Sequence, residues 1–196
     1  MTESIEFQIV QALLTAIELK DQHTKGHSER VAEYSKMIAS RYGLSEKEQE
    51  NIYMMALLHD VGKIGIPDEI LNKFGRLMDM EYDIIKRHTV MGAAILENIK
   101  DYPELATGAR FHHERFDGSG YPDGLAGDDI PIEARIIAVA EAYDAMTSQY
   151  HYREPFSQDQ VRAEIERCSG SQFDPMFAKI MIEMIDEDSE FVLREK

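Results

Sequence analysis

The chain has 196 residues, which is enough for one sizeable hydrophobic core or at most two small ones. Its hydrophobic content of 43% and charged content of 30% are ordinary for a folded domain and argue against disorder. The formal net charge of −16 opposes binding to a nucleic-acid backbone or to anionic lipid. An anionic small substrate would therefore need bound cations or local arginines that reverse the potential.

The single cysteine and the first twenty residues indicate in which cellular compartment the protein is expected. Cys168 has no partner for an intramolecular disulfide, and this fits a reducing environment. The N-terminal stretch mixes acids with apolar residues and lacks the features of a secretory signal, and no segment approaches the roughly 18 apolar residues of a membrane span. We expect a cytoplasmic protein without membrane insertion.

Apolar residues recur at three- and four-residue steps along most of the chain, which predicts helices. Thr24 is a suitable N-cap for the second helix, and Ser45 with Glu48 forms a capping-box pattern for the third. The expected helices span about 4–20, 24–43, 45 onward, 79–99, 103–113, 132–148, 157–168 and 175–187. No segment alternates with period two, so we predict an all-α fold in one domain over residues 1–196. Helix 4–20 could also join this domain to a sensor domain in a longer protein.

One segment, "RFDGSGYPDGLAGDDIP" at 115–131, interrupts the helical pattern. It holds four glycines and two prolines in seventeen residues, too many for the interior of a helix. A loop of this length inside a compact domain is usually functional or disordered.

Two pairs of potential metal ligands, His59–Asp60 and His112–His113, stand at predicted helix ends. Adjacent side chains on a helix point about 100° apart, so neighbours can bind different ions. Imidazole and carboxylate suit zinc, iron and manganese, and Asp60 has two oxygens with which it could bridge two ions. A two-metal site can activate water and clamp the oxygens of a displacement at phosphorus. The alternative is that both pairs are merely polar helix ends, as most single histidines are.

Five motifs in order resemble the HD-GYP family, bacterial cyclic di-GMP phosphodiesterases within the HD superfamily of metal-dependent phosphohydrolases. They are "HSERV" at 27–31, "LLHDVGKIGIP" at 57–67, "KRHTVMG" at 86–92, "HHERFDGSGYPDGL" at 112–125 and "AYDAMTS" at 142–148. The similarity runs from about residue 12 to Asp174–Pro175. It implies an HD-type helical bundle in which 115–131 is the long signature loop.

The resemblance also implies roles for individual residues. Asp60 would bridge two divalent ions, with iron or manganese favoured and zinc or nickel acceptable, and Lys63 would act near the scissile phosphate. Alternatively, Lys63 is a solvated cation at a helix end. The implied metal ligands are His27, His59, Asp60, His88, His112 and His113. The implied substrate loop comprises Arg115, Asp117, Gly118, Gly120, Tyr121 and Pro122. In the family this loop also contacts partner proteins. Tyr121 would offer a face to a guanine base, or else pack into the core.

Three positions depart from the family pattern. Glu141 stands where the family has an aspartate as the last metal ligand, and its two oxygens can still ligate. Tyr150 stands where the family often has a phosphate-binding arginine, leaving Arg153 as the nearby basic residue. His23 stands where members with three metals have a glutamate, so a third ion is the less favoured alternative to two.

The implied reaction opens the ring of cyclic di-GMP to linear pGpG, and can go on to GMP. In it a metal-bridging hydroxide attacks phosphorus while Lys63 stabilises the developing charge. Two alternatives stay open. One is a catalytically weak or inactive regulator that binds nucleotide or docks to cyclic di-GMP synthases with GGDEF domains. The other is a hydrolase of a different cyclic dinucleotide. A homodimer is compatible with either, and no nucleic-acid polymer is expected as a partner.

Overall fold

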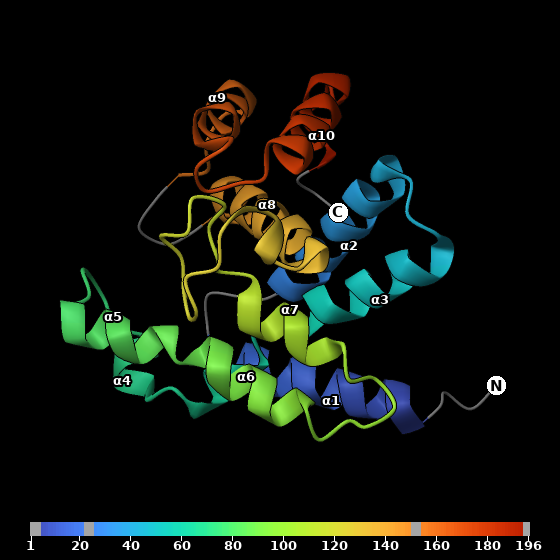
Figure 1. Ribbon diagram of the computed structural model, residues 1–196. Helices are drawn as coiled ribbons and strands as arrows, with labels where there is room; N and C mark the ends of the chain where they lie inside the picture. Colours follow the sequence, from blue (N-terminus) through green and yellow to red (C-terminus); the bar gives the residue numbers. More distant parts are fainter. Residues whose placement is uncertain (1–4, 22–25, 150–153, 194–196) are drawn as a thin grey trace.

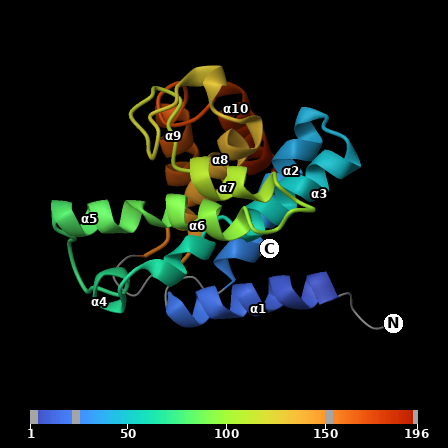
Figure 2. The same ribbon diagram turned by 60° about the horizontal axis from the view of Figure 1, so that its bottom comes forward.

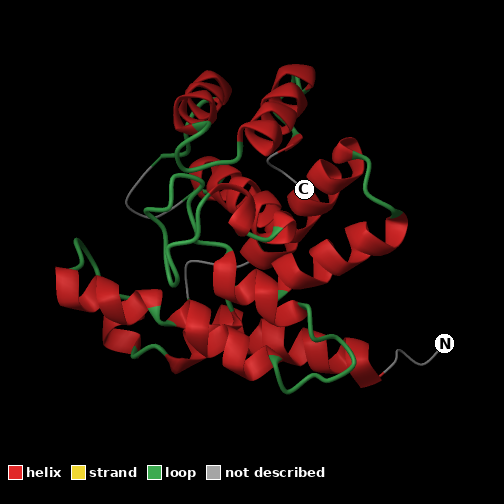
Figure 3. Ribbon diagram, in the orientation of Figure 1, coloured by secondary structure: helices red, strands yellow, loops and turns green. Residues whose placement is uncertain are grey.

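A computed structural model describes residues 5–21, 26–149 and 154–193. Within this part the chain is helical, and the one bridge of β type joins Ser169 to Phe173. The α-helices are α1 (Ile5–Lys20), α2 (His27–Tyr42), α3 (Glu46–Leu57), α4 (Asp68–Leu71), α5 (Asp79–Lys86), α6 (His88–Leu96), α7 (Leu105–Phe111), α8 (Ile132–Thr147), α9 (Gln158–Cys168) and α10 (Pro175–Glu187). Two short 3-10 turns are η1 (Val61–Gly65) and η2 (Gly127–Asp129). The all-α prediction is confirmed (Figure 3).

The helices form two groups that meet where α7 packs against α3 and α8 (Figures 1 and 2). Helix α2 packs against α3 and α8, while α9 and α10 pair with each other beside α8. On the opposite side, α6 packs against α7 and η1, and α1 lies along η1. The core combines aliphatic side chains with the buried rings of Tyr34, Tyr143 and Phe177. Its fully buried aliphatic residues include Val31, Ile38, Ile52, Ile136 and Val139.

Helix α1 is part of this core. Leu14 and Ile17 on its inner face are 6% and 1% exposed. Its role as a junction to a sensor domain stays a prediction. None of the helices in the described ranges is long and apolar enough to cross a membrane.

The predicted capping box at the start of α3 is confirmed. The Ser45 hydroxyl accepts the amide of Glu48, and the Glu48 carboxylate accepts the amide of Ser45 at 2.8 Å. This pairing satisfies two donors that a helix start otherwise leaves open. Helix α2 begins at His27 after Gly26, later than predicted, and Thr24 lies outside the described residues.

The prediction of one helix over 79–99 was wrong, because the chain breaks at Arg87 into α5 and α6. Side chains just beyond the break take carbonyl groups that a continuous helix would use. His88 Nδ1 lies 2.7 Å from the Ile85 oxygen, and the Thr89 hydroxyl donates to the Lys86 oxygen at 2.9 Å. Such local bonds compete with the backbone ladder of the helix. The break turns His88 inward, where it is 1% exposed.

The glycine of the "HDVGK" motif permits a close approach between η1 and α6. A Cβ atom on Gly62 would lie 1.9 Å from the His88 oxygen and 2.4 Å from the Gly92 nitrogen. Because any larger residue would push η1 away, Gly62 keeps Asp60 beside His88.

We expect Gly62→Ala to lower the free energy of unfolding by about 3 kcal/mol, since backbone atoms must move to admit the methyl group. Chemical denaturation followed by circular dichroism would measure this. Gly43→Ala is the matched control: its φ is 95° but no atom lies within 4 Å of the added Cβ, so only backbone strain of about 1–2 kcal/mol is expected. Equal losses in the two variants would contradict a role for crowding at Gly62.

Candidate metal centre and its cavity

Seven potential metal ligands, far apart in sequence, meet at the junction of α2, α3, α6, α7 and α8. Their donor atoms form two groups of three in which all donors lie within 4.8 Å of one another. The first group is His88, His112 and His113, and the second is His27, His59 and Glu141. Asp60 joins His59 and His112 in a third set that links the two groups.

The Asp60 carboxylate lies between the two groups. Its Oδ1 is 3.5 Å from His88 Nε2, whereas its Oδ2 is 3.4 Å from His59 Nε2 and 3.8 Å from His27 Nε2. Two ligands of one ion with bonds of about 2.0–2.2 Å are typically separated by such distances. Each oxygen therefore faces a different ligand group, which is the arrangement that a bridging carboxylate requires.

Each central imidazole presents Nε2 to this junction because Nδ1 is engaged elsewhere. His59, His88 and His112 place Nδ1 at 2.5, 2.7 and 2.9 Å from the carbonyl oxygens of Ala56, Ile85 and Gly108. A carbonyl oxygen only accepts, so Nδ1 carries the proton, and in the neutral ring Nε2 is a free lone pair. These bonds fix ring orientation in the way that outer partners of metal ligands do.

The atoms that face the junction fit divalent ions. His59 Nε2 and Asp60 Oδ1 are buried without a hydrogen-bond partner in the described part of the chain. His88 Nε2 and His112 Nε2 are only 3.1 Å apart, so two lone pairs face each other. A cation between such donors would remove both the repulsion and the unsatisfied groups. Nitrogen and carboxylate donors without a thiolate suit iron, manganese and zinc.

Burial also keeps two of the rings in the ligand form. It holds the pKa of His112 and that of His113 well below the usual histidine value, and the neighbouring imidazoles add to this effect. Both are therefore neutral at neutral pH, and only a neutral imidazole binds a metal ion.

Lys63 lies at the edge of this centre, where two carboxylates hold its ammonium group. Nζ is 2.8 Å from Asp60 Oδ2 and 2.9 Å from Asp21 Oδ2. Burial alone would lower the pKa of Lys63, but the charges of Asp60 and Asp21 raise it above its usual value. Lys63 is therefore a permanent cation, and it is not a solvated side chain at a helix end. Asp21, at the end of α1, was missed because nothing in the local sequence pairs it with a residue 42 positions away.

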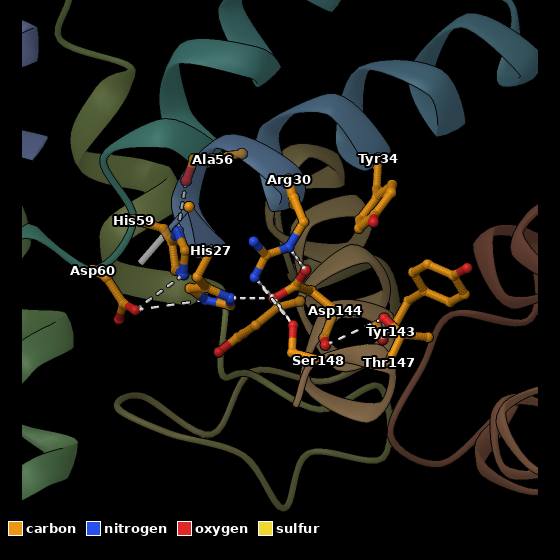
Figure 4. Close-up of polar contacts among 12 residues, drawn as sticks. His27, Arg30, Tyr34, Ala56, His59, Asp60, Tyr143, Asp144, Thr147 and Ser148 are labelled. Carbon is orange, nitrogen blue, oxygen red and sulfur yellow. Dashed lines mark hydrogen bonds and ion pairs between the residues drawn. The ribbon is translucent and has the colours of Figure 1, made fainter. Parts of the chain in front are cut away.

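A second buried carboxylate, Asp144, supports His27 from behind (Figure 4). Asp144 Oδ2 accepts His27 Nδ1 at 2.7 Å, while Oδ1 accepts Arg30 Nε at 2.5 Å. Ser148 bonds to both Arg30 and Asp144 at 3.1 Å. Burial by itself would raise the pKa of Asp144, yet His27 and Arg30 lower it, so the carboxylate stays ionised. Sequence reasoning missed this residue, although a carboxylate inside the apolar run of α8 was a usable signal.

A cavity of 590 Å³ opens onto the centre, a size typical of small-ligand sites. Asp60, Lys63 and Glu141 lie in its wall beside His88, His112 and His113. Among the predicted loop residues, Arg115 and Tyr121 line the cavity. Asp117, Gly118, Gly120 and Pro122 lie elsewhere in the loop, where Asp117 accepts the amide and hydroxyl of Ser119.

The loop is held against the centre by a residue that sequence reasoning missed, Glu114. Glu114 is 3% exposed, and its carboxylate accepts the amides of Asp123, Gly124 and Leu125 at 2.7 to 3.1 Å. Tyr121 packs its ring on His113, with centroids 4.8 Å apart at 32°. Tyr121 thus contacts a potential ligand as well as the cavity. His23, Tyr150 and Arg153 lie outside the described residues, so their predicted roles stay predictions.

Comparison with known proteins identifies the family of this chain. Residues 11–177 match the family model described as HD domain. This chain belongs to the HD domain family. Its resemblance to the HD-GYP branch is confirmed by its relatives. It is 41% identical over 99% of its length to a cyclic di-GMP phosphodiesterase of Thermotoga maritima, and 40% identical over 92% to 3′3′-cGAMP-specific phosphodiesterase 2 of Vibrio cholerae.

The fold of this HD-GYP chain also has a solved counterpart. A crystal structure of a cyclic GMP-AMP specific phosphodiesterase from Vibrio cholerae superimposes with a TM-score of 0.70 at 20% identity, over 94% of this chain and 49% of the other. The chain spans 53% of the Thermotoga protein and 35% of the Vibrio relative. The shared part is thus about half of these relatives or less.

Glu141 in this HD-GYP chain still reaches the centre despite its extra methylene. It shares a ligand group with His27 and His59, and its Oε1 is 3.7 Å from His113 Nε2. The side chain therefore faces both groups, as Asp60 does.

We expect Asp144→Asn to weaken metal binding by about 10- to 100-fold, because the amide removes the negative charge that orients and polarises His27. Metal content after equilibrium dialysis, measured by mass spectrometry, would show this. Asp186→Asn is the matched control, since Asp186 is a half-exposed partner of Arg162 outside the cavity lining. Unchanged metal affinity in Asp144→Asn would contradict the orienting role.

Proposed function

We propose that this chain is a metal-dependent phosphodiesterase that hydrolyses cyclic di-GMP to pGpG and can continue to GMP. The observation that carries the proposal is the pair of ligand groups linked by Asp60, with Asp60, Glu141 and the group of His88, His112 and His113 in the wall of a cavity of substrate size. The names of the relatives, cyclic di-GMP and 3′3′-cGAMP phosphodiesterases, support the substrate class.

The proposed centre holds two divalent ions. His88, His112 and His113 would hold one, His27, His59 and Glu141 the other, and Asp60 would contact both. Such ions supply a nucleophile from water at neutral pH and stabilise charge on phosphoryl oxygens. We propose iron or manganese as the native metal, with zinc and nickel also compatible with nitrogen and oxygen donors.

The residues of the chain prepare the site for an anionic substrate. Lys63 is held beside Asp60 by Asp21. Its positive charge would therefore lie near the phosphodiester bond to be broken, and the side chain would not need to move during the reaction. In the reaction the oxygen of water bonds to phosphorus, the bond to the 3′ oxygen breaks, and that oxygen leaves with a proton as the 3′ hydroxyl. Opening one bond of the ring gives pGpG, and a second hydrolysis gives GMP.

We place the protein in the cytoplasm, in keeping with its free, buried Cys168. Docking to GGDEF proteins and formation of a homodimer stay predictions.

The deciding experiment is turnover of cyclic di-GMP by the purified chain, with products separated by chromatography. We expect pGpG to form after anaerobic loading with Fe(II) or Mn(II), and activity to vanish with a chelator and return when metal is restored. Metal binding without any product would contradict the proposal and favour a nucleotide-binding regulator.

We expect Asp60→Asn to lower kcat by at least roughly 10²-fold, since it removes a charge from the junction of the two ligand groups. Bound metal should fall in parallel. Asp128→Asn is the matched control, because Asp128 is 93% exposed and pairs only with Arg135 in the described part of the chain. Full activity of Asp60→Asn after removal of metal would contradict the mechanism.

A further inference from the structure

The cavity has two chemically different ends. One end, here called the aromatic end, is lined by Tyr82 and Ile85 of α5 and by Tyr121 of the loop. The other, here called the polar end, is lined by Glu164 and Cys168 of α9 and by Gln172. Helices α5 and α9 stand well apart, with the loop between them (Figure 1). Five of the potential metal ligands line the same cavity: Asp60, His88, His112, His113 and Glu141.

The aromatic end offers a stacking surface. Tyr82 is 48% exposed, and its ring stands edge-on to Tyr121 with centroids 6.4 Å apart. The ammonium of Lys86 lies 5.3 Å from the Tyr82 centroid, so a cation also borders this surface. Stacking on an aromatic ring accepts any base, because every base has a π-face.

The polar end offers a carboxylate, Glu164, that is paired with Arg167. Arg167 holds both oxygens of Glu164, with Nε to Oε2 at 2.8 Å and Nη2 to Oε1 at 2.5 Å. Arg167 lowers the pKa of Glu164, so the group is an acceptor at neutral pH. Oε1 also accepts a bond from Cys168 Sγ at 3.6 Å, whereas Oε2 keeps a further lone pair after this fork.

A carboxylate in a cavity that receives an anion needs hydrogen-bond donors, of which Arg167 supplies two and a bound base can supply a further one. The Watson–Crick edge of guanine presents two adjacent donors, N1–H and the exocyclic amino group, either of which can bond to the remaining lone pair of Glu164 Oε2. Adenine presents a lone pair at N1 on the same edge, which a carboxylate repels.

We infer that the two ends hold the two bases of a cyclic dinucleotide differently, with one base stacked at Tyr82 and a guanine selected by Glu164 at the polar end. This inference rests on the proposed function and specifies its substrate. One guanine is then sufficient. The protein should cleave cyclic di-GMP and 3′,3′-cGAMP and reject cyclic di-AMP.

The inference also fixes which bond is cut in the mixed dinucleotide. If the guanine always lies at the polar end, one of the two phosphodiesters always faces the metal ligands. Of the two linear products, pApG and pGpA, a single one should therefore form first.

The first test measures kcat/KM of the metal-loaded wild-type chain on the three dinucleotides, with linear products separated by chromatography. We expect similar values for cyclic di-GMP and 3′,3′-cGAMP and a value about 10- to 150-fold lower for cyclic di-AMP, the range for loss of bonds to a charged group. We also expect one linear product from 3′,3′-cGAMP.

The second test changes the carboxylate alone. Glu164→Gln should lower kcat/KM for both guanine substrates by about tenfold or more, leave cyclic di-AMP unchanged or improved, and yield both linear products from 3′,3′-cGAMP. Glu166→Gln is the matched control, two residues along the same helix and bonded to Arg162 outside the cavity lining. Metal content should equal that of wild type in both variants.

The third test changes the stacking surface. Tyr82→Ala should raise KM for the guanine substrates about 5- to 150-fold with little change in kcat, and Tyr82→Phe should restore the wild-type KM. Tyr102→Ala, at a residue of similar exposure outside the cavity lining, should have no effect.

The outcomes separate the inference from the proposed function. Absence of turnover on all three dinucleotides would overturn both. Turnover of cyclic di-AMP as fast as that of cyclic di-GMP, or equal amounts of pApG and pGpA from the wild type, would overturn the inference alone. A strong preference for cyclic di-GMP over 3′,3′-cGAMP would also overturn it, because both bases would then be selected.

Discussion

The buried charge of Asp60 is the constraint on which the rest of the structure depends. Its side chain is about 2% exposed, and an ionised carboxylate removed from water costs several kcal/mol unless cations compensate it. Burial alone would raise the pKa of Asp60, but Lys63 and the surrounding histidines hold it well below its usual value. Lys63 in turn is balanced by Asp21. The ion pairs of Lys63 with Asp60 and Asp21 connect α1 and η1 to the centre. One Asp60 oxygen still faces each group of potential ligands.

Helix termini supply most of the other donors, and this has a structural reason. A side chain in the middle of a helix is committed to one face, whereas a residue at a break can turn toward a neighbouring element. His59 and Asp60 follow the end of α3, His88 follows the break after α5, and His112 and His113 follow the end of α7. Breaks that look like defects in helical periodicity thus concentrate donors at one point. The cost of each break is offset by hydrogen bonds such as that of His88 Nδ1 to the Ile85 oxygen.

The negative charge of the chain shapes what the cavity can accept. With a net charge of −16, the protein repels anions over most of its surface, so binding of a phosphodiester depends on local cations. Lys63 and Arg115 are the cationic side chains in the described lining, and carboxylates occupy the wall as well. Metal ions at the junction would therefore both attract the anionic phosphodiester and position it. A carboxylate such as Glu164 at one end then favours a base edge rich in donors.

The sequence by itself determined the helical class, most helix positions and the loop at 115–131. Its motifs, through their resemblance to a known family, also indicated the seven residues that converge on the centre. Periodicity and caps report local hydrogen bonding and amphipathicity, and these are properties of neighbouring residues. The tertiary structure alone decided that Asp144 supports His27, that Asp21 balances Lys63, and that Glu114 anchors the loop. It also decided the break at Arg87. Partners separated by more than a hundred residues, such as His27 and Asp144, meet only when α2 packs against α8, and no local pattern encodes that contact.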